Sequence, residues 1–74
     1  MTIEDLKKQL NDYGHLEVCK AGQVLTILIT GSGLSNAIKL RNIQNVIIKF
    51  SDDKYPKIEV FKNEANYLLA VLRP

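Results

Sequence analysis

The first thirteen residues carry apolar side chains at the spacing of one helix face. The stripe, at steps of 3, 4 and 3, is Ile3, Leu6, Leu10 and Tyr13. Thr2 precedes it and Asp5 follows three residues later, which is a variant of the capping box that begins many helices. Gly14 then stands where a left-handed terminating residue is favoured. The pattern predicts an N-terminal helix of about 12 residues.

From residue 15 the pattern changes to the alternation of a β-strand. Leu16 and Val18 fall on one face, with His15, Glu17 and Cys19 on the other. Ala21-Gly22 then supplies a turn, and the run 23–30 returns with many β-branched residues. Because this run is apolar on both faces, it is typical of a strand covered on both sides. Residues 15–30 therefore predict a hairpin, which ends at Gly31-Ser32-Gly33.

The segment from residue 34 to 43 fits two patterns, of which the strand is favoured. One is a strand face with Leu34, Ile38 and Leu40, and the other is a short helix with Leu34, Ala37, Ile38 and Arg41. A turn region at 42–45 follows. Residues 46–50 then predict a further strand, which is bounded by a turn at 51–54.

The last third of the chain predicts two strands. Pro56 cannot donate to a sheet, so the first begins at Lys57, with Ile58 and Val60 inward and Lys57, Glu59 and Phe61 outward. A turn at 62–64 leads to the second strand, residues 67–72, which is apolar on both faces. No internal repeat or linker is evident along the chain.

These elements predict a single α+β domain covering residues 1–74, with the N-terminal helix packed on a mainly antiparallel sheet of about five strands. A helix about 10 Å wide covers only part of one sheet face. Either the sheet curls into a small barrel, or a second copy of the chain covers the remainder. We therefore expect a homo-oligomer. The candidate interface residues are Leu68, Ala70 and Leu72.

Composition indicates an ordinary folded protein, with 46% hydrophobic and 24% charged residues. One cysteine cannot form an internal disulfide, which favours a reducing compartment. The acidic N-terminus lacks the pattern of an export signal, and the longest apolar run, residues 68–72, is far shorter than the roughly 20 residues of a membrane span. We expect a cytoplasmic protein with no membrane partner.

No catalytic constellation is evident, so we expect neither an enzyme nor a bound metal or cofactor. His15 and Cys19 would lie roughly 13 Å apart along a strand, too far to share a zinc ion or a proton. The Gly31–Gly33 segment lacks the Gly-Lys-Ser/Thr ending of a phosphate loop. Asp52-Asp53 is typical of a solvated turn.

Charge distribution favours a second class of partner. Residues 37–74 hold seven bases and four acids, a net charge of +3, whereas residues 1–36 have a net charge of −1. Lys39, Arg41 and Lys49 could form a basic stripe beside Tyr55 or Phe61, a pattern that suits phosphate contacts and base stacking.

The order of one N-terminal helix followed by about five strands is similar to that of Sm-like RNA-binding barrels. Val60-Phe61-Lys62-Asn63 loosely resembles the tyrosine-lysine-histidine segment of their bacterial members. The resemblance implies RNA or DNA binding as the alternative function. The main hypothesis is a non-catalytic binding or regulatory module that acts through a sheet face or edge, with its partner, protein or nucleic acid, undetermined.

Overall fold

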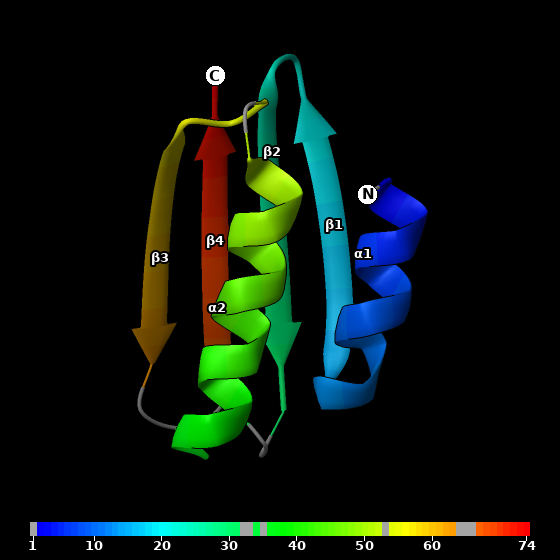
Figure 1. Cartoon of the computed structure of the whole chain (residues 1–74), viewed down its shortest axis with the longest axis vertical. Coiled ribbons are helices and arrows are strands. Elements are labelled where there is room, and N and C mark those ends of the chain that lie inside the picture. The colour runs from blue at the N-terminus through cyan, green and yellow to red at the C-terminus, as the bar shows by residue number, and fades with distance from the viewer. Residues whose placement is uncertain (1, 32–33, 35, 53, 64–66) are drawn as a thin grey trace.

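The computed structural model describes residues 2–31, 34, 36–52, 54–63 and 67–74, and it forms one antiparallel sheet with two helices (Figure 1). The elements in chain order are α1 (Ile3–Leu10), the 3-10 turn η1 (Asn11–Tyr13), β1 (His15–Ala21), β2 (Val24–Thr30), α2 (Ala37–Ser51), β3 (Lys57–Asn63) and β4 (Tyr67–Arg73). The predicted α+β class, N-terminal helix and first hairpin are confirmed. The strands predicted from residue 57 and over residues 67–72 are also confirmed.

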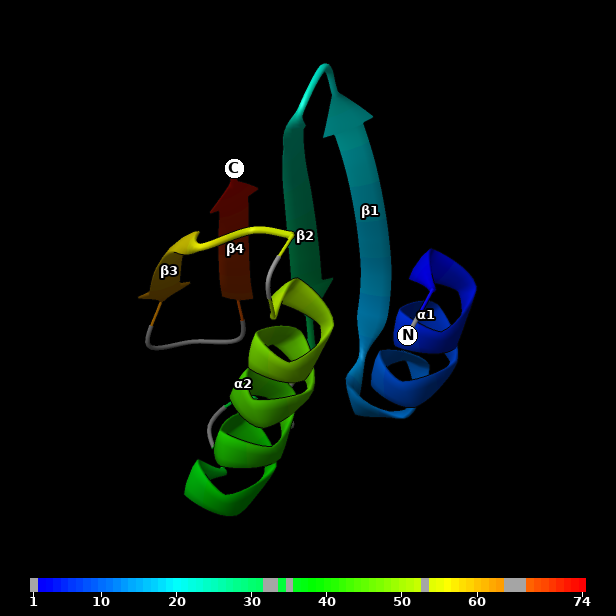
Figure 2. The ribbon, with the colours of Figure 1, turned by 45° about the horizontal axis from the view of Figure 1, so that its top comes forward.

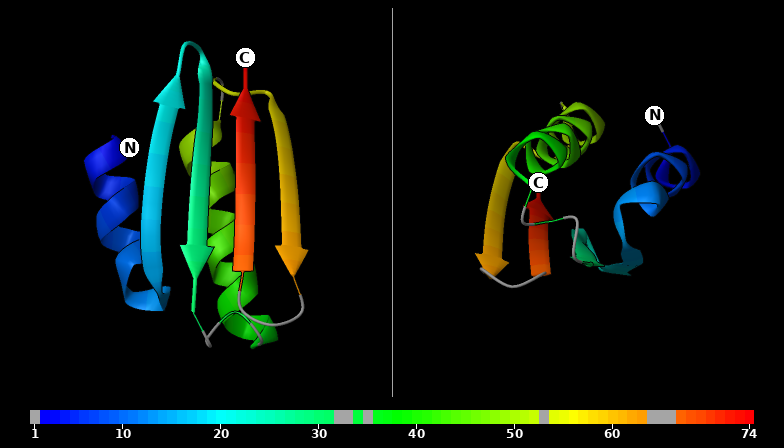
Figure 3. Two further views of the ribbon diagram at one scale, coloured as in Figure 1. Left: turned by 180° about the vertical axis from the view of Figure 1, so that it is seen from behind. Right: turned by 90° about the horizontal axis from the view of Figure 1, so that it is seen from below.

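The four strands lie in the order β1-β2-β4-β3, and every neighbouring pair is antiparallel. Both helices lie on the same side of the sheet, as Figure 2 and the end-on view of Figure 3 show. The outer strands β1 and β3 do not pair with each other, so the sheet is open. The described residues therefore form four strands where about five were expected, and the barrel, one of the two alternatives for covering the sheet, is not confirmed.

The main error concerns residues 34–50, where the favoured interpretation was two strands separated by a turn at 42–45. Residues 37–51 instead form the single helix α2. Its N-cap is Asn36, whose side-chain oxygen accepts hydrogen bonds from the backbone N–H groups of Ile38 and Lys39, at 2.9 and 3.2 Å. Ile43, Ile47 and Phe50 recur at helical spacing and are buried. The β-branched residues favour strands only weakly, and this packing overrides that preference.

The N-terminal helix begins as predicted, but α1 has 8 residues and passes into the 3-10 turn η1, where one helix of about 12 residues was expected. The Thr2 hydroxyl accepts a hydrogen bond from the Asp5 backbone N–H at 3.2 Å, and the Asp5 carboxylate accepts one from the Thr2 N–H at 3.1 Å. This backbone hydrogen bond, followed by the Thr2 side chain, lowers the pKa of Asp5 below its ordinary value of 3.8. Leu6 and Leu10 are the buried residues of α1. The capping box thus sets where the helix starts.

Gly14 was expected to be left-handed, and this is wrong. Its φ of 161° is extended, a conformation open to any residue. A Cβ added at Gly14 would instead collide with the backbone carbonyl of Thr30. A glycine is needed here because β1 begins against the end of β2 at a distance that leaves no room for a side chain. Gly22, in the β1–β2 turn, has a left-handed φ of 62°.

The core lies between the helices and one face of the sheet. The side chains that point toward the helices from the two central strands are fully buried, at 0% exposure: Leu25, Ile27, Ile29, Leu68, Ala70 and Leu72. The helices and the loop before α2 complete the core with Leu6, Leu10, Leu34, Ile43, Ile47 and Phe50. The predicted turns 31–33, 51–54 and 62–64 each fall partly on residues outside the described part of the chain.

The fold contains a repeat that was not evident in the sequence. A helix followed by two strands occurs twice, and the second strands of the two units, β2 and β4, pair at the centre of the sheet. Aligning the first residues of β1 and β3 matches residues 13–20 with residues 55–62, and four of these eight positions are identical. The identical pairs are Tyr13 and Tyr55, Glu17 and Glu59, Val18 and Val60, and Lys20 and Lys62. The two outer strands thus occupy equivalent places.

Candidate functional site

His15, Glu17 and Cys19 share one face of β1, as predicted. The His15 Nε2 and Glu17 Oε1 atoms are 3.6 Å apart, and both side chains are mostly exposed. Cys19 is exposed. Among the described residues, no three His, Cys, Asp or Glu side chains are placed so that they could hold a metal ion.

Lys39, Arg41 and Lys49 are all exposed and all lie on α2 rather than on neighbouring strands. On a helix with about 100° of rotation per residue, Lys39 and Arg41 point about 160° apart. Lys49 lies roughly 12 Å from Arg41 along the axis at a rise of 1.5 Å per residue. The three cations therefore do not line up as the basic stripe that the sequence pattern suggested.

The candidate interface residues Leu68, Ala70 and Leu72 lie on the face of β4 that points into the core. All three are 0% exposed within a single chain because they point to the side of the sheet on which the helices lie (Figure 3). Buried and half-buried side chains alternate along β4, as expected for a strand with two different faces. The set that reaches the surface consists of Tyr67, Leu69 and Val71, each of which is half-buried.

The helix-free face of the sheet, which we name the open face, is apolar at its centre and polar at its edges. Neither helix covers it in the view from behind (Figure 3, left). Leu28, Leu69 and Phe61 sit opposite one another on β2, β4 and β3, and they form one row across three strands. Thr26 and Val71 make the next row. Toward the edges, Arg73 and Glu59 form an ion pair at 3.1 Å, and both are about half exposed.

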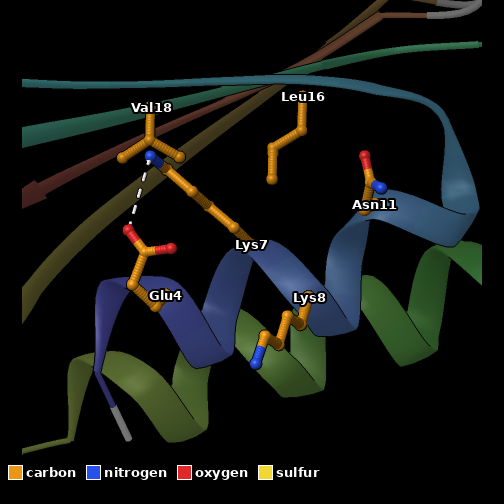
Figure 4. Close-up of a pocket in the computed structure, with 6 residues that line it drawn as sticks. All are labelled: Glu4, Lys7, Lys8, Asn11, Leu16 and Val18. Atoms are coloured by element: carbon orange, nitrogen blue, oxygen red, sulfur yellow. Dashed lines mark ion pairs between the residues drawn. The ribbon is translucent and has the colours of Figure 1, made fainter.

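A first groove lies between α1 and the outer strand β1, with a volume of about 340 Å³. Figure 4 shows the Lys7 side chain reaching across it toward Val18, with its ammonium group 4.0 Å from the Glu4 carboxylate. Lys7 thus covers part of the apolar surface of β1 with its aliphatic stem, while its charge stays in solvent. Leu16 and Val18 are accordingly half-buried.

A second groove lies between α2 and the other outer strand, β3, with a volume of about 270 Å³. Its lining residues are Gln44, Ile47, Ile48, Ile58 and Val60. Ile48 is 56% exposed and Val60 is 41% exposed. Val60 is the repeat equivalent of Val18, but the two grooves differ. Lys7 covers the apolar residues of β1, whereas the apolar side chains of the α2–β3 groove are exposed.

All the large apolar side chains that are exposed in the described part of the chain belong to α2 and β3: Ile38, Ile48, Val60 and Phe61. Sequence reasoning placed Phe61 outward correctly but missed Ile48, which it assigned to a strand. The signal that could have found Ile48 is the spacing of Ile43, Ile47 and Phe50, because a helix that buries these three turns Ile48 away from them.

No protein-family model matches the chain, and no curated protein or solved structure is significantly similar to it. No helix in the described part of the chain is both long enough and apolar enough to cross a membrane.

Proposed function

We propose that this protein is a non-catalytic binding module that self-associates by packing the open face of its sheet against the open face of a second copy. The observation that carries the proposal is the apolar row Leu28, Leu69 and Phe61, on a sheet whose helices both lie on the opposite side. Contiguous exposed apolar surface on a small domain marks an interaction site.

A second sheet is the occupant that suits this surface. Two sheets pack face to face at a separation of about 10 Å, with side chains of both inner faces interdigitating. Apart from Arg73 at the end of β4, the outward-facing residues of the two central strands are uncharged. Burying the central strands therefore removes few charges from water, while the charged residues of the outer strands on this face, His15, Glu17, Lys57 and Glu59, form the rim of the contact. A twofold axis would let the same surface serve both copies and would close the assembly at two.

The size of the surface suits a moderate affinity. Four strands of seven residues each give a footprint of about 440 Å² at roughly 4.8 Å between strands and 3.3 Å per residue. Such an area lies at the low end for specific protein complexes. We therefore expect a dimer that dissociates in the micromolar range.

The test compares three variants by light scattering coupled to size exclusion, over loading concentrations from about 5 to 500 μM. Leu69→Lys should give a monomer with an unchanged circular dichroism spectrum, because the side chain can reach solvent once the dimer separates. Ile38→Lys is the matched control, since Ile38 is 74% exposed on α2 and away from the open face. It should remain dimeric.

Thr26→Arg is the second variant on the open face. It is chosen because the native threonine side chain is already polar and half-buried there. It should also be monomeric, which keeps the test decisive if Leu69→Lys does not fold. A wild-type protein that stays monomeric at 500 μM would overturn the proposal.

A further inference from the structure

The outer strand β3 has a free edge, and one of its residues, Phe61, also lies on the open face. β3 is the last strand of the sheet, so the backbone groups on its outer side pair with no other strand of the described chain. A free edge can accept an extended segment as an additional strand, with backbone hydrogen bonds supplying affinity and side chains supplying selectivity.

Apolar side chains lie on both faces of this edge. Val60 points to the helix side, where it lines the groove with Ile48, and Phe61 points to the open face with 51% exposure. A strand added beside β3 would alternate its own side chains between the same two faces. It would cover Val60 and Ile48 with one apolar residue and Phe61 with the next.

The charge of this region selects among possible partners. Between residues 36 and 63 the chain has six bases and three acids, a net charge of +3, and one of the acids, Glu59, is engaged with Arg73. Lys57 and Lys62 stand at the two ends of the apolar part of β3, and both are exposed. Opposite charges directly across two strands are favourable, and like charges are unfavourable.

A third cation lies at the Lys62 end of the groove. α2 and β3 run in opposite directions (Figure 1), and Gln44 and Val60 are groove residues on the two elements. Arg41 lies about one turn before Gln44 on α2, and Lys62 follows Val60 by two positions on the same strand face. Arg41 and Lys62 therefore continue the groove at the same end, and both are exposed.

We propose that the β3 edge and its groove bind an extended segment of another protein in which acidic residues flank a short apolar stretch. The segment pairs antiparallel with β3, so that its first residue lies opposite Lys62 and its last opposite Lys57. It has an acid opposite Lys62, an aromatic or apolar residue opposite Phe61 and a β-branched residue opposite Val60. It continues with a polar residue, an apolar residue opposite Ile58 and an acid opposite Lys57. A second copy of this chain is disfavoured here because its β3 carries the same positive charge.

The probe is the fluorescein-labelled peptide Glu-Tyr-Val-Thr-Ile-Glu, and its binding is measured by fluorescence anisotropy at low salt. Ile48→Glu should weaken binding at least tenfold, because it places a carboxylate in the groove. Ile38→Glu is the matched control: the same change on the same helix, at a residue that does not line the groove. Because Ile38 lies beside Arg41, the new carboxylate offsets that one exposed cation and should weaken binding no more than about threefold.

A charge exchange tests the chemistry of the segment. The peptide Lys-Tyr-Val-Thr-Ile-Lys should bind wild-type protein at least tenfold more weakly than the acidic peptide. In the Lys62→Glu variant, the affinities of the two peptides should lie closer together, because the acidic peptide loses a favourable partner and the basic peptide gains one. Equal binding of the two peptides, equal effects of Ile48→Glu and Ile38→Glu, or no binding of the acidic peptide would each overturn the proposal.

Light scattering separates this site from the proposed dimer. Ile48→Glu should keep the oligomeric state of the wild type, and Leu69→Lys should keep peptide binding. If Ile48→Glu alone converted a dimer to a monomer, the edge would be an interface between copies, and the peptide proposal would be wrong.

Discussion

Truncation of two adjacent isoleucines, Ile47→Ala and Ile48→Ala, tests where α2 packs. Ile47 is 1% exposed within the core, whereas Ile48 is 56% exposed. Residues 46–50 were predicted to be a strand, in which Val46, Ile48 and Phe50 would share one face. In the helix, Ile47 shares the buried face with Ile43 and Phe50 instead. The pair of variants therefore asks which side chain the fold needs.

The magnitude follows from burial. Ile47→Ala removes three buried carbon groups at about 0.8 kcal/mol each, and the cavity left behind adds to this, so the expected loss is about 3 kcal/mol. A domain of 74 residues has an unfolding free energy of roughly 4–11 kcal/mol. With an unfolding entropy of about 0.16 kcal/mol/K for this length, the melting temperature should fall by about 19 °C.

The assay is urea denaturation followed by circular dichroism at 222 nm, since the chain has no tryptophan to report by fluorescence. Ile48→Ala should stay within about 0.5 kcal/mol of wild type, because alanine has the higher helix propensity and little burial is lost. An Ile48→Ala variant as destabilised as Ile47→Ala would refute the helical packing. So would an Ile47→Ala variant that melts with the wild type.

Two further predictions concern the first half of the chain. Gly14→Ala should destabilise the fold by about 1–3 kcal/mol, because the new Cβ meets the Thr30 carbonyl and the backbone must shift; an unchanged melting temperature would argue against this close approach. The lowered pKa of Asp5 means that its carboxylate adds stability that is complete above pH 3.8 and is lost as the pH falls through the lower pKa of the folded state. Asp5→Asn should therefore have a lower urea midpoint than wild type at pH 7, and the two midpoints should converge near pH 2; a gap that persists there would contradict the assignment.

Local signals were sufficient for much of the fold. The capping box at Thr2 and Asp5 and the leucine stripe located α1, because both depend on residues within a few positions of one another. Alternation and Gly22 located the first hairpin, and Pro56 marked the start of β3. The separation of Leu68 from Leu69 by face also follows from the sequence, because strand side chains alternate.

The helix α2 could not be recognised from the same kind of signal. Its run of Val46, Ile47 and Ile48 has the composition of a strand, and the helical spacing of Ile43, Ile47 and Phe50 competes with it. The repeat was missed for a related reason. The similarity is concentrated in residues 13–20 and 55–62, and its meaning depends on knowing that both segments enter equivalent outer strands.

The sequence by itself determined the first helix, the strands outside residues 34–50, and the division of β4 into two sets of side chains. Only the tertiary structure decided which set is core. Leu68 and Leu69 are the same residue type, and burial depends on which face receives the helices. Since one layer of helices covers one face, the equally apolar residues on the other face remain at the surface. The open face and the β3 edge exist for that reason.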